Sequence, residues 1–543
     1  MNSKFWNTMM HWIKILLLAP LIAIANPTLA ANCAPGSVGI DTNSVISGWS
    51  AGPGNLRYTP PSDAGPTPSS ISDWSPAWVF ALPDTDAPRS QPAVTRDTVF
   101  IADGDGGVYA LDRQTACEKW RFDAGSMVRT AMRLVHTGDT ALLTFGTLDA
   151  DLIALDPETG SEVWRTRVSD HPRAMISGST AEHDGVLYQG VSSWEVFWAA
   201  NPFYACCTFR GGLVAVDAAT GALLWQAHTI EEEPRVTQSR VLLPDHKGPS
   251  GAPVWSHPAI DPERRRLYVG TGENYSTPAT DSSDAILAFD LDTGKRIWTR
   301  QFTASDAWNV ACVIPGHHNC PEENGGDLDF GAPPILTSLG DVDYLLAGQK
   351  TGLVVALDPA TGATHWSRTL GGGGKAGGVH FGMAADPERG LLYVPISDRD
   401  VGVLLGDSGS GAPQPSLHAL DIATGETRWA VDSPADCLAP DGEGTVEGCY
   451  RGFSAPVTVV GDIVFAPTLD GVLRAFHADS GDQIWTFDTA RQFSAVNGGY
   501  AEGGAIDLGG VYVAGDEIYL NSGYGLVDQI PGNAFIQFRP EEQ

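Results

Sequence analysis

The chain has 543 residues, with 62 glycines, 37 prolines and a formal net charge of −32 at pH 7. That length exceeds one ordinary compact domain unless the fold is a barrel, a sandwich or a propeller. The acidic excess disfavours nucleic acid and anionic membrane surfaces as partners. A basic redox partner or an uncharged substrate is compatible with this charge.

The first 31 residues have the organisation of a secretory signal peptide. Lys4 and Lys14 precede an apolar stretch at 15–25, and small residues follow at 28–31. The apolar stretch is too short to cross a bilayer, and the small residues are typical of a cleavage site. We therefore expect a mature chain of residues 32–543 that is periplasmic or secreted and has no membrane span.

The eight cysteines are an even number, which favours disulfides in an exported chain. Their order along the chain leaves the pairing open. The sequence contains no Cys-x-x-Cys-His motif, so we expect no covalently attached c-type haem. The candidate pairs are Cys33–Cys117, Cys206–Cys207, Cys312–Cys320 and Cys437–Cys449.

A repeat of the form Ala-x-Asp-x-x-Thr-Gly-x-x-x-Trp recurs along the chain. Each copy is typical of a strand that ends at the Asp, a Thr-Gly turn with positive φ, and a strand that starts at the Trp. Trp78 has the flanks of this position without the preceding turn. Five clear copies end at Trp164, Trp225, Trp298, Trp366 and Trp429, and two degenerate copies end at Trp120 and Trp485.

These repeats predict the fold. One such unit cannot bury both of its faces, whereas units stacked around an axis can. Successive tryptophans are 42 to 73 residues apart, and a four-stranded blade needs about 40 residues. We predict an all-β, eight-bladed β-propeller in one domain, with Trp78 in a closing blade shared by both chain ends. The repeat tryptophans are assigned to the core, docked between neighbouring blades.

The repeat resembles the tryptophan-docking motif of pyrroloquinoline quinone (PQQ) dehydrogenases, over nearly the whole mature chain. Several segments resemble the polyvinyl alcohol dehydrogenase branch of that family: CCTFRGGLVAVD, GAPVWSHPAID, LYVGTGENYS, DAWNVAC, DLDFGAPP, AGQKTGLVVALD and GGVHFGM. Scaffold proteins of outer membrane assembly have similar propellers, so the site residues must carry the functional argument.

The resemblance implies a calcium ion held by oxygen ligands. Glu195 follows Gly-Val-Ser-Ser-Trp, where the family's metal-binding Glu follows a Gly-Ser-Ser stretch. Glu273 stands in the register of the family's calcium-ligating Asn, and Asn274 comes next, so either is a candidate ligand. The Asp327/Asp329 pair leaves a metal other than calcium open.

The family's catalytic string Asp-x-Trp-Asp is altered here. It reads Asp306-Ala-Trp-Asn309, and an insert with two cysteines separates it from Asp327-Leu-Asp329. Since related enzymes have Asp-x-Asp directly after the Trp, we expect the insert to split the motif. Asp327 is then the base and a metal ligand, with Asp329 near it, and Asp306 is the alternative base.

Cofactor contacts are implied in the same way. Trp255 matches the tryptophan that forms the floor under the quinone, and Lys350 matches the cation that stabilises negative charge on the quinone oxygens. A Cys206–Cys207 ring is either a ceiling over the quinone or a structural staple, since the family's ring sits in an earlier blade. Further candidate contacts are Ser177, Ser193, Arg210 with Arg129 as its alternative, and Asn497 in a late turn.

The sequence therefore suggests a periplasmic, PQQ- and calcium-dependent dehydrogenase for secondary alcohols, with polyvinyl alcohol as a candidate substrate. Electrons would pass to an external cytochrome c. Two alternatives remain: a non-catalytic scaffold or polymer-binding propeller, and a PQQ-dependent sugar or aldehyde dehydrogenase. The altered positions Asn309 and Asn274 favour the first alternative, or a changed use of the metal. The second alternative differs in its substrate, and substrate choice depends on the shape of the loops.

Overall fold

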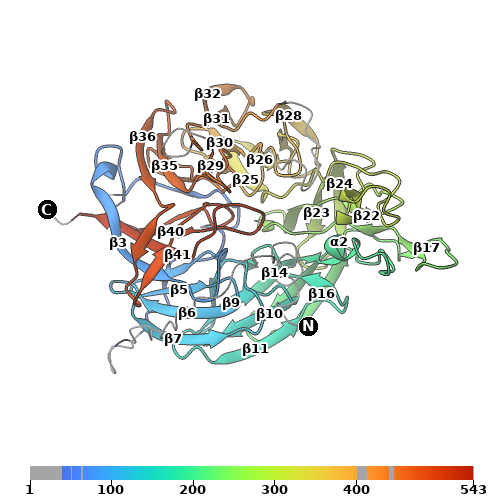
Figure 1. Cartoon of the computed structure of the whole chain (residues 1–543), viewed down its shortest axis with the longest axis horizontal. Coiled ribbons are helices and arrows are strands. Elements are labelled where there is room, and N and C mark those ends of the chain that lie inside the picture. The colour runs from blue at the N-terminus through green and yellow to red at the C-terminus, as the bar shows by residue number, and fades with distance from the viewer. Residues whose placement is uncertain are drawn as a thin grey trace, which may run out of the picture.

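The computed structural model describes residues 33, 40–50, 52–62, 65–399, 412–438 and 445–541. Almost all regular structure there is β-strand, and eight sheets of four or five strands stand around a common axis (Figure 1). This confirms the predicted all-β, eight-bladed propeller. The expected signal peptide lies outside the described residues. None of the helices in the described part has the length and apolar character to cross a membrane.

The first four blades follow the chain from its start. Blade 1 contains β1 (Ser44–Ile46), β4 (Ala93–Thr95), β5 (Thr98–Ala102), β6 (Gly107–Asp112) and β7 (Glu118–Asp123). Blade 2 contains β8 (Arg133–Thr137), β9 (Thr140–Gly146), β10 (Asp151–Leu155) and β11 (Glu162–Arg167). Blade 3 contains β12 (Ala174–Met175), β13 (Ala181–His183), β14 (Val186–Ser193), β15 (Gly212–Asp217) and β16 (Leu223–His228). Blade 4 contains β20 (Ala259–Asp261), β21 (Arg266–Gly270), β23 (Ala285–Asp290) and β24 (Arg296–Gln301).

The remaining blades complete the ring. Blade 5 contains β25 (Ile335–Leu339), β26 (Val342–Gly348), β27 (Leu353–Leu357) and β28 (Thr364–Thr369). Blade 6 contains β29 (Ala384–Asp386), β30 (Leu391–Ile396), β31 (Ser416–Asp421) and β32 (Thr427–Asp432). Blade 7 contains β2 (Tyr58–Thr59), β33 (Thr458–Val460), β34 (Ile463–Phe465), β35 (Val472–His477) and β36 (Gln483–Asp488). Blade 8 contains β39 (Val511–Val513), β40 (Ile518–Ser522), β41 (Ala534–Pro540) and β3 (Trp74–Ala81).

Blade 8 closes the ring with strands from both chain ends, as the sequence predicted. Strand β3 pairs antiparallel with β41 from Trp74 opposite Pro540 to Ala81 opposite Ala534 (Figure 1, blue beside red). Trp78 lies on β3, the outermost strand of its blade, where the repeat tryptophans of the other blades also lie. Closing the ring in this way pairs strand edges that would otherwise be open.

Each docked tryptophan joins two blades, and Trp366 shows how. Its Nε1 donates to the carbonyl of Ile422 in the next blade at 2.8 Å. Gly425 of that blade's Thr-Gly turn has φ +69°, and a Cβ there would lie 2.6 Å from the Trp366 ring. The turn itself is fixed by the Asp421 carboxylate, which accepts from the backbone N–H of Thr424 at 2.9 Å and from its hydroxyl at 3.1 Å. The Asp, Thr, Gly and Trp of the repeat therefore act as one interlocking unit.

A segment near the start of the chain ties several blades together. We call residues 48–50 and 52–57 the N-terminal strap. Arg57 within it is 5% exposed and donates to Val457 and Val511 of blades 7 and 8. The strap's backbone bonds join Gly48 to Met132, Pro53 to Ile260, Gly54 to Leu336, Leu56 to Ala385 and Arg57 to Val459. These partners lie in or beside the innermost strands of blades 2, 4, 5, 6 and 7.

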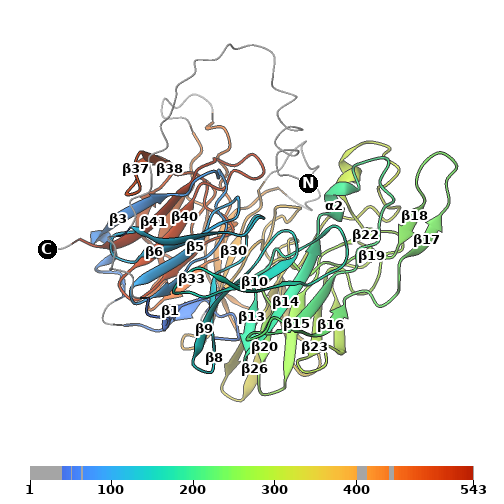
Figure 2. The same ribbon diagram turned by 90° about the horizontal axis from the view of Figure 1, so that it is seen from below.

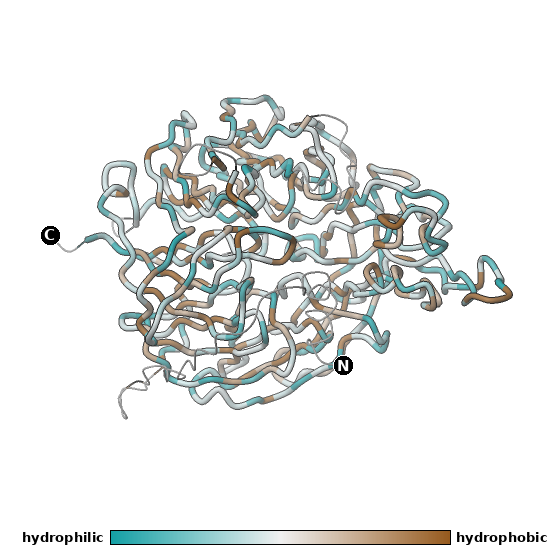
Figure 3. Tube along the Cα trace, viewed as in Figure 1, coloured by the Kyte–Doolittle hydropathy of each residue, from teal (hydrophilic) through white to brown (hydrophobic). Residues whose placement is uncertain are grey.

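Elements outside the blades cluster on the side of blades 3 and 4. They are β17 (Arg235–Gln238), β18 (His246–Gly248), β19 (Ser250–Gly251), β22 (Asn274–Ser276), α2 (Glu195–Trp198) and η2 (Val310–Val313). The β17–β18 hairpin projects from the rim (Figure 2), and its apolar tip includes Val241, which is 98% exposed (Figure 3). Elsewhere lie the hairpin of β37 (Gln492–Ser494) with β38 (Tyr500–Glu502), and η1 (Ile71–Asp73).

Four disulfides join the candidate cysteine pairs, and no cysteine is free. Cys33–Cys117 connects the start of the described chain to blade 1. Cys206–Cys207 and Cys312–Cys320 lie in the loops near blades 3 and 4, and Cys437–Cys449 lies between blades 6 and 7. The disulfides predicted from the cysteine count are thus confirmed.

The docking contact predicts a graded loss of stability. Trp366→Ala removes both the ring and its N–H, so we expect the free energy of unfolding to fall by about 3–5 kcal/mol. Trp366→Phe keeps most of the packing and loses the bond to Ile422, at a cost of about 1–2 kcal/mol. Urea unfolding followed by circular dichroism measures both changes. Equal losses in the two variants would show that the N–H, and not the ring, holds the blades together.

Candidate active site

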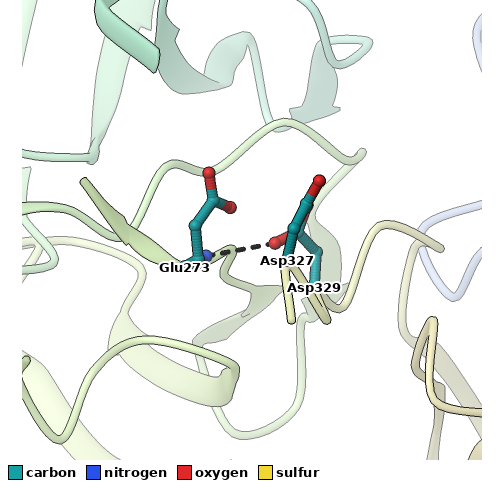
Figure 4. A group of neighbouring side chains, drawn as sticks. All are labelled: Glu273, Asp327 and Asp329. Carbon is teal, nitrogen blue, oxygen red and sulfur yellow. Dashed lines mark hydrogen bonds between the residues drawn. The ribbon is translucent and has the colours of Figure 1, made fainter. Parts of the chain in front are cut away.

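Three carboxylates and one ammonium meet at the inner ends of blades 4 and 5. Glu273 lies between β21 and β22, Asp327 and Asp329 precede β25, and Lys350 follows β26. One carboxylate oxygen from each acid lies within 4.8 Å of the others (Figure 4). Lys350 Nζ donates to Asp327 Oδ1 at 2.7 Å and to Asp329 Oδ2 at 2.8 Å. We call these four side chains the carboxylate centre.

Trp255 adjoins the carboxylate centre. Its Nε1 donates to Asp329 Oδ2 at 3.2 Å, and Lys350 Nζ lies 5.4 Å from the centre of its ring. Gly331 makes room for the indole, since a Cβ there would come within 2.0 Å of the ring. Asp329 also accepts from the backbone N–H of Glu273 at 3.1 Å. Asp329 therefore fixes the tryptophan, the lysine and the Glu273 backbone at once.

Burial and neighbouring charges separate the two aspartates chemically. Burial raises the pKa of Asp327 to about 7, with Asp329 adding to the rise and Lys350 opposing it. Burial also favours the neutral form of Asp329, but Lys350 and the hydrogen bonds from Glu273 outweigh it and lower the pKa of Asp329. The centre thus holds one permanently ionised carboxylate and one that gains and loses a proton near neutral pH.

Two more buried acids lie beside the centre. Asp306 Oδ2 accepts from the Leu328 N–H at 3.2 Å, while its Oδ1 has no partner among the described residues. Burial, and then Asp329, raise the pKa of Asp306 to about 6. Asp284 is fully buried, neither carboxylate oxygen has a partner in the described part, and burial followed by Asp306 raises its pKa well above the usual value. Sequence reasoning missed Asp284, which no motif marks.

The expected metal ligands fall into two sets. Glu273, Asp327 and Asp329 converge, and their oxygens suit a hard cation. Glu195 lies elsewhere, because its carboxylate accepts from the Tyr204 hydroxyl at 2.7 Å and from the Phe209 N–H at 2.7 Å. The Asn274 side chain is also engaged, donating to the Ser250 carbonyl at 3.0 Å and accepting from the Thr280 N–H at 2.7 Å.

The Cys206–Cys207 disulfide lies with Glu195 in the loops over this region. It is buried in one apolar cluster with Phe209 and Tyr275. Burial, then Glu273, Asp329 and Glu195, raise the pKa of Tyr275, so its ring lies within electrostatic reach of both the centre and Glu195. The backbone of Lys247 bonds both cysteines, and so the β17–β18 hairpin supports the disulfide.

The remaining expected cofactor contacts are distributed over the fold. Ser177 shares the lining of one hollow with Arg129 and Trp255, and its Oγ lies 2.6 Å from Ser192 Oγ. The other three side chains have their polar atoms engaged away from the centre. Ser193 donates to the Arg173 carbonyl, Arg210 pairs with Glu233 at 2.6 Å, and Asn497 makes two bonds with the Ala81 backbone.

Sequence reasoning missed several side chains near Trp255. Arg89 of blade 1 lines the same hollow as Arg129 and Trp255. His380 forms an edge contact with Trp255 at 6.5 Å and stacks on Phe381 at 4.0 Å. Arg399 lies close enough to lower the pKa of His380, after burial, Lys350 and Arg129. His380 lies in the family-like segment GGVHFGM, which gave it no role, and no motif marks Arg89 or Arg399. The three residues come from different loops, and only the folded ring brings them together.

A ring of tryptophan-docked blades around a buried lysine–carboxylate centre beside an indole defines the quinoprotein class of propeller. The solved quinohemoprotein alcohol dehydrogenase from Comamonas testosteroni shares this fold, with a TM-score of 0.63 at 19% identity over 90% of this chain and 80% of that one. A family model described as outer membrane protein assembly factor BamB matches residues 71–298, 282–409 and 406–527, which contain the repeats.

Relatives of established activity make the assignment more specific. The polyvinylalcohol dehydrogenase of a Pseudomonas species is 35% identical, over 90% of this chain and 74% of the relative. That of Sphingopyxis sp. strain 113P3 is 36% identical, over 92% of this chain and 76% of the relative. The chain belongs to the PQQ-dependent quinoprotein alcohol dehydrogenase family, in its polyvinyl alcohol dehydrogenase branch, and is an oxidoreductase.

The raised pKa of Asp306 predicts a pH-dependent effect on stability. A folded-state pKa of about 6 against an ordinary 3.8 means that the acid stabilises the fold at low pH and loses this contribution as the pH rises through 6. Asn at this position has no such loss. From pH 4 to pH 7.5 we expect Asp306→Asn to gain about 2–3 kcal/mol relative to the unsubstituted chain.

Denaturant unfolding in the presence of a chelator measures this difference, with Asp139→Asn in an exposed turn as the control. A gain that is the same at both pH values would contradict the assignment of the raised pKa to Asp306.

Proposed function

We propose that this protein is an exported PQQ-dependent dehydrogenase that oxidises secondary alcohols, including polyvinyl alcohol, and transfers the electrons to an external cytochrome c. The observation that carries the proposal is the carboxylate centre against Trp255: a buried acid with a pKa of about 7, held by an ammonium beside an aromatic surface. The substrate class comes from the two relatives named polyvinylalcohol dehydrogenase.

The residues fit the implied cofactor and cation. PQQ is a flat, tricarboxylated quinone that needs an aromatic floor and cationic partners, and Trp255, Lys350 and Arg129 supply both. The Nε of Arg129 is buried without a partner among the described residues, which suits an absent anion. Glu273, Asp327 and Asp329 would hold calcium, or another hard cation, through carboxylate oxygens. When bound, PQQ supplies the acceptor for the hydride that leaves the alcohol carbon.

The chain's own residues remove the proton, stabilise negative charge and orient the groups of the site. Asp327 takes the hydroxyl proton, since its pKa near 7 lets it exist as the base at neutral pH. Lys350 stays protonated, because Asp327 and Asp329 outweigh the effect of burial and raise its pKa, so it stabilises negative charge that develops next to it. Asp329 orients Lys350 and the Trp255 indole. Asp306, with one oxygen that has no partner in the described part of the chain, is the alternative base.

The sequence supports the proposals of export and of an external electron acceptor. Residues 1–31 have the pattern of a cleaved signal, and no c-type haem motif is present to receive electrons within the chain. A separate cytochrome c is therefore the proposed acceptor. N-terminal sequencing of the mature protein and a reduction assay with a soluble c-type cytochrome in place of dye test these two points.

The central test is reconstitution of the purified apo-protein with PQQ and calcium, followed by dye-linked oxidation of polyvinyl alcohol, small secondary alcohols, sugars and aldehydes. We expect alcohol oxidation that requires both additions. Asp327→Asn should lower kcat by about 10²–10⁴, because the base is lost. Asp139→Asn, on the surface, serves as the matched control.

The outcomes separate the alternatives. A larger loss in Asp306→Asn than in Asp327→Asn would transfer the role of base to Asp306. A preference for sugars or aldehydes would change the substrate class on the same fold. Failure of PQQ to bind with any of several metals would remove the enzymatic proposal and favour a scaffold.

Calcium affinity should rise with pH. Burial, and then Asp329 and Asp327, raise the pKa of Glu273, so calcium must displace its proton. We expect tighter binding at pH 8 than at pH 6, and Glu273→Gln should weaken binding by at least about tenfold and reduce the pH dependence. Calorimetric titration measures both.

Glu195→Gln is the comparison, because Glu195 is bonded within its own loop. Unchanged calcium affinity in this variant supports a site formed by the carboxylate centre, and an equal loss would return Glu195 to the ligand set.

A further inference from the structure

Two arginines line the same hollow as Trp255, the buried Arg89 and the half-buried Arg129, and neither guanidinium has a hydrogen-bond partner among the described residues. Arg89 is 5% exposed, and in the described part of the chain neither it nor Arg129 donates a side-chain hydrogen bond or forms an ion pair. The Nε of Arg89, Arg129 and Arg399 is in each case buried and unpartnered. A buried guanidinium with unmet donors is costly, which makes a bound anion the natural partner for these groups.

The three arginines converge from different blades. Arg89 precedes β4 in blade 1, Arg129 precedes β8 in blade 2 and Arg399 follows β30 in blade 6. The Arg89 guanidinium lies 5.5 Å from the centre of the Tyr524 ring, and that of Arg129 lies 5.7 Å from the centre of the Phe381 ring. All three carry charges that lower the pKa of Tyr524, against the larger opposing effect of burial.

One acid, Asp507, lies among the three arginines and can neutralise at most one of their charges. Asp507 bonds Gln529 at 3.2 Å through one oxygen, and its other oxygen has no partner among described residues. Burial raises its pKa to about 6, although Arg399 and Arg129 act to lower it. Within a chain of net charge −32, this locality has three guanidiniums and one carboxyl group.

The side chains between them are apolar. Phe381, Leu508, Tyr524 and Trp255 pack together as one cluster. Arg129 lies 6.0 Å from the centre of the Trp255 ring and Lys350 lies 5.4 Å from it. The indole thus borders the arginines as well as the carboxylate centre. A planar aromatic anion satisfies both the apolar surface and the unpaired donors.

We propose that Arg89, Arg129 and Arg399 form an anion cradle that binds the carboxylates of a planar polycarboxylate lying against Trp255. This inference rests on the proposed function only in naming PQQ as that ligand. It gives the ligand one orientation, with its acidic groups toward the cradle and its reacting end toward Asp327 and Lys350. It also assigns the anion contact to residues other than Arg210, which pairs with Glu233.

The experiment compares two ligands and matched variants of the full-length mature protein. Calorimetry measures binding of PQQ and of benzene-1,2,4-tricarboxylate, which has no quinone. We expect Arg89→Gln and Arg129→Gln each to weaken PQQ binding by about tenfold to a hundredfold and to abolish measurable tricarboxylate binding. Arg210→Gln is the control and should bind both ligands as the unsubstituted chain does.

Thermal unfolding separates a binding role from a structural one. Removing an unpaired buried cation should raise the midpoint of the ligand-free protein and shrink the upward shift that PQQ causes. A lowered midpoint with unchanged affinity for PQQ would overturn the cradle and leave the proposed function intact. Tricarboxylate binding that needs the arginines, with no binding of PQQ, would keep the cradle and overturn the proposed function.

Discussion

The contact between each docked tryptophan and the turn of the next blade is the interaction on which the rest of the structure depends. It combines a large buried ring, one N–H bond to a carbonyl and a glycine that leaves space for the indole, as at Trp366, Ile422 and Gly425. Because this tryptophan–turn contact recurs between blades, it sets the angle between neighbouring blades and so the width of the space around the axis. The loops that carry Glu273, Asp327 and Lys350 meet only because that spacing is constant.

The rigid ring permits an electrostatic arrangement that a looser fold would not hold. Lys350, Asp327 and Asp329 are all largely buried, and each would be costly alone. Held together, Asp329 stays ionised, Lys350 stays protonated and Asp327 titrates near neutral pH. The same burial leaves Asp284 and Asp306 with oxygens that have no partner among the described residues. These charged side chains are thus concentrated near the axis of the ring, and the apolar strands separate them from water.

The sequence predicted the architecture well, because the repeat encodes it locally. The Asp, Thr, Gly and Trp positions gave the blade count and the shared closing blade, and the even cysteine count gave the disulfides. The site was harder to predict. Short motifs identified Trp255 and the four members of the carboxylate centre, which the structure brings together. Glu195, Arg210 and Asn497 also resembled family positions, yet their polar atoms are engaged by neighbouring loops. Arg89, Arg399 and Asp284 had no local pattern, since their position near the centre depends on where distant loops end.

The N-terminal strap has a consequence for how the chain is made. The strap precedes all of its partners in the sequence, which extend from Met132 in blade 2 to Val459 in blade 7, and β3 pairs with the much later strand β41. Blades can form one after another, but the strap completes its bonds only when blade 7 exists, and β3 has no partner strand until β41 exists. The ring closes only when β41 pairs with β3, so synthesis that stalls before this strand would leave an open arc in place of a smaller propeller.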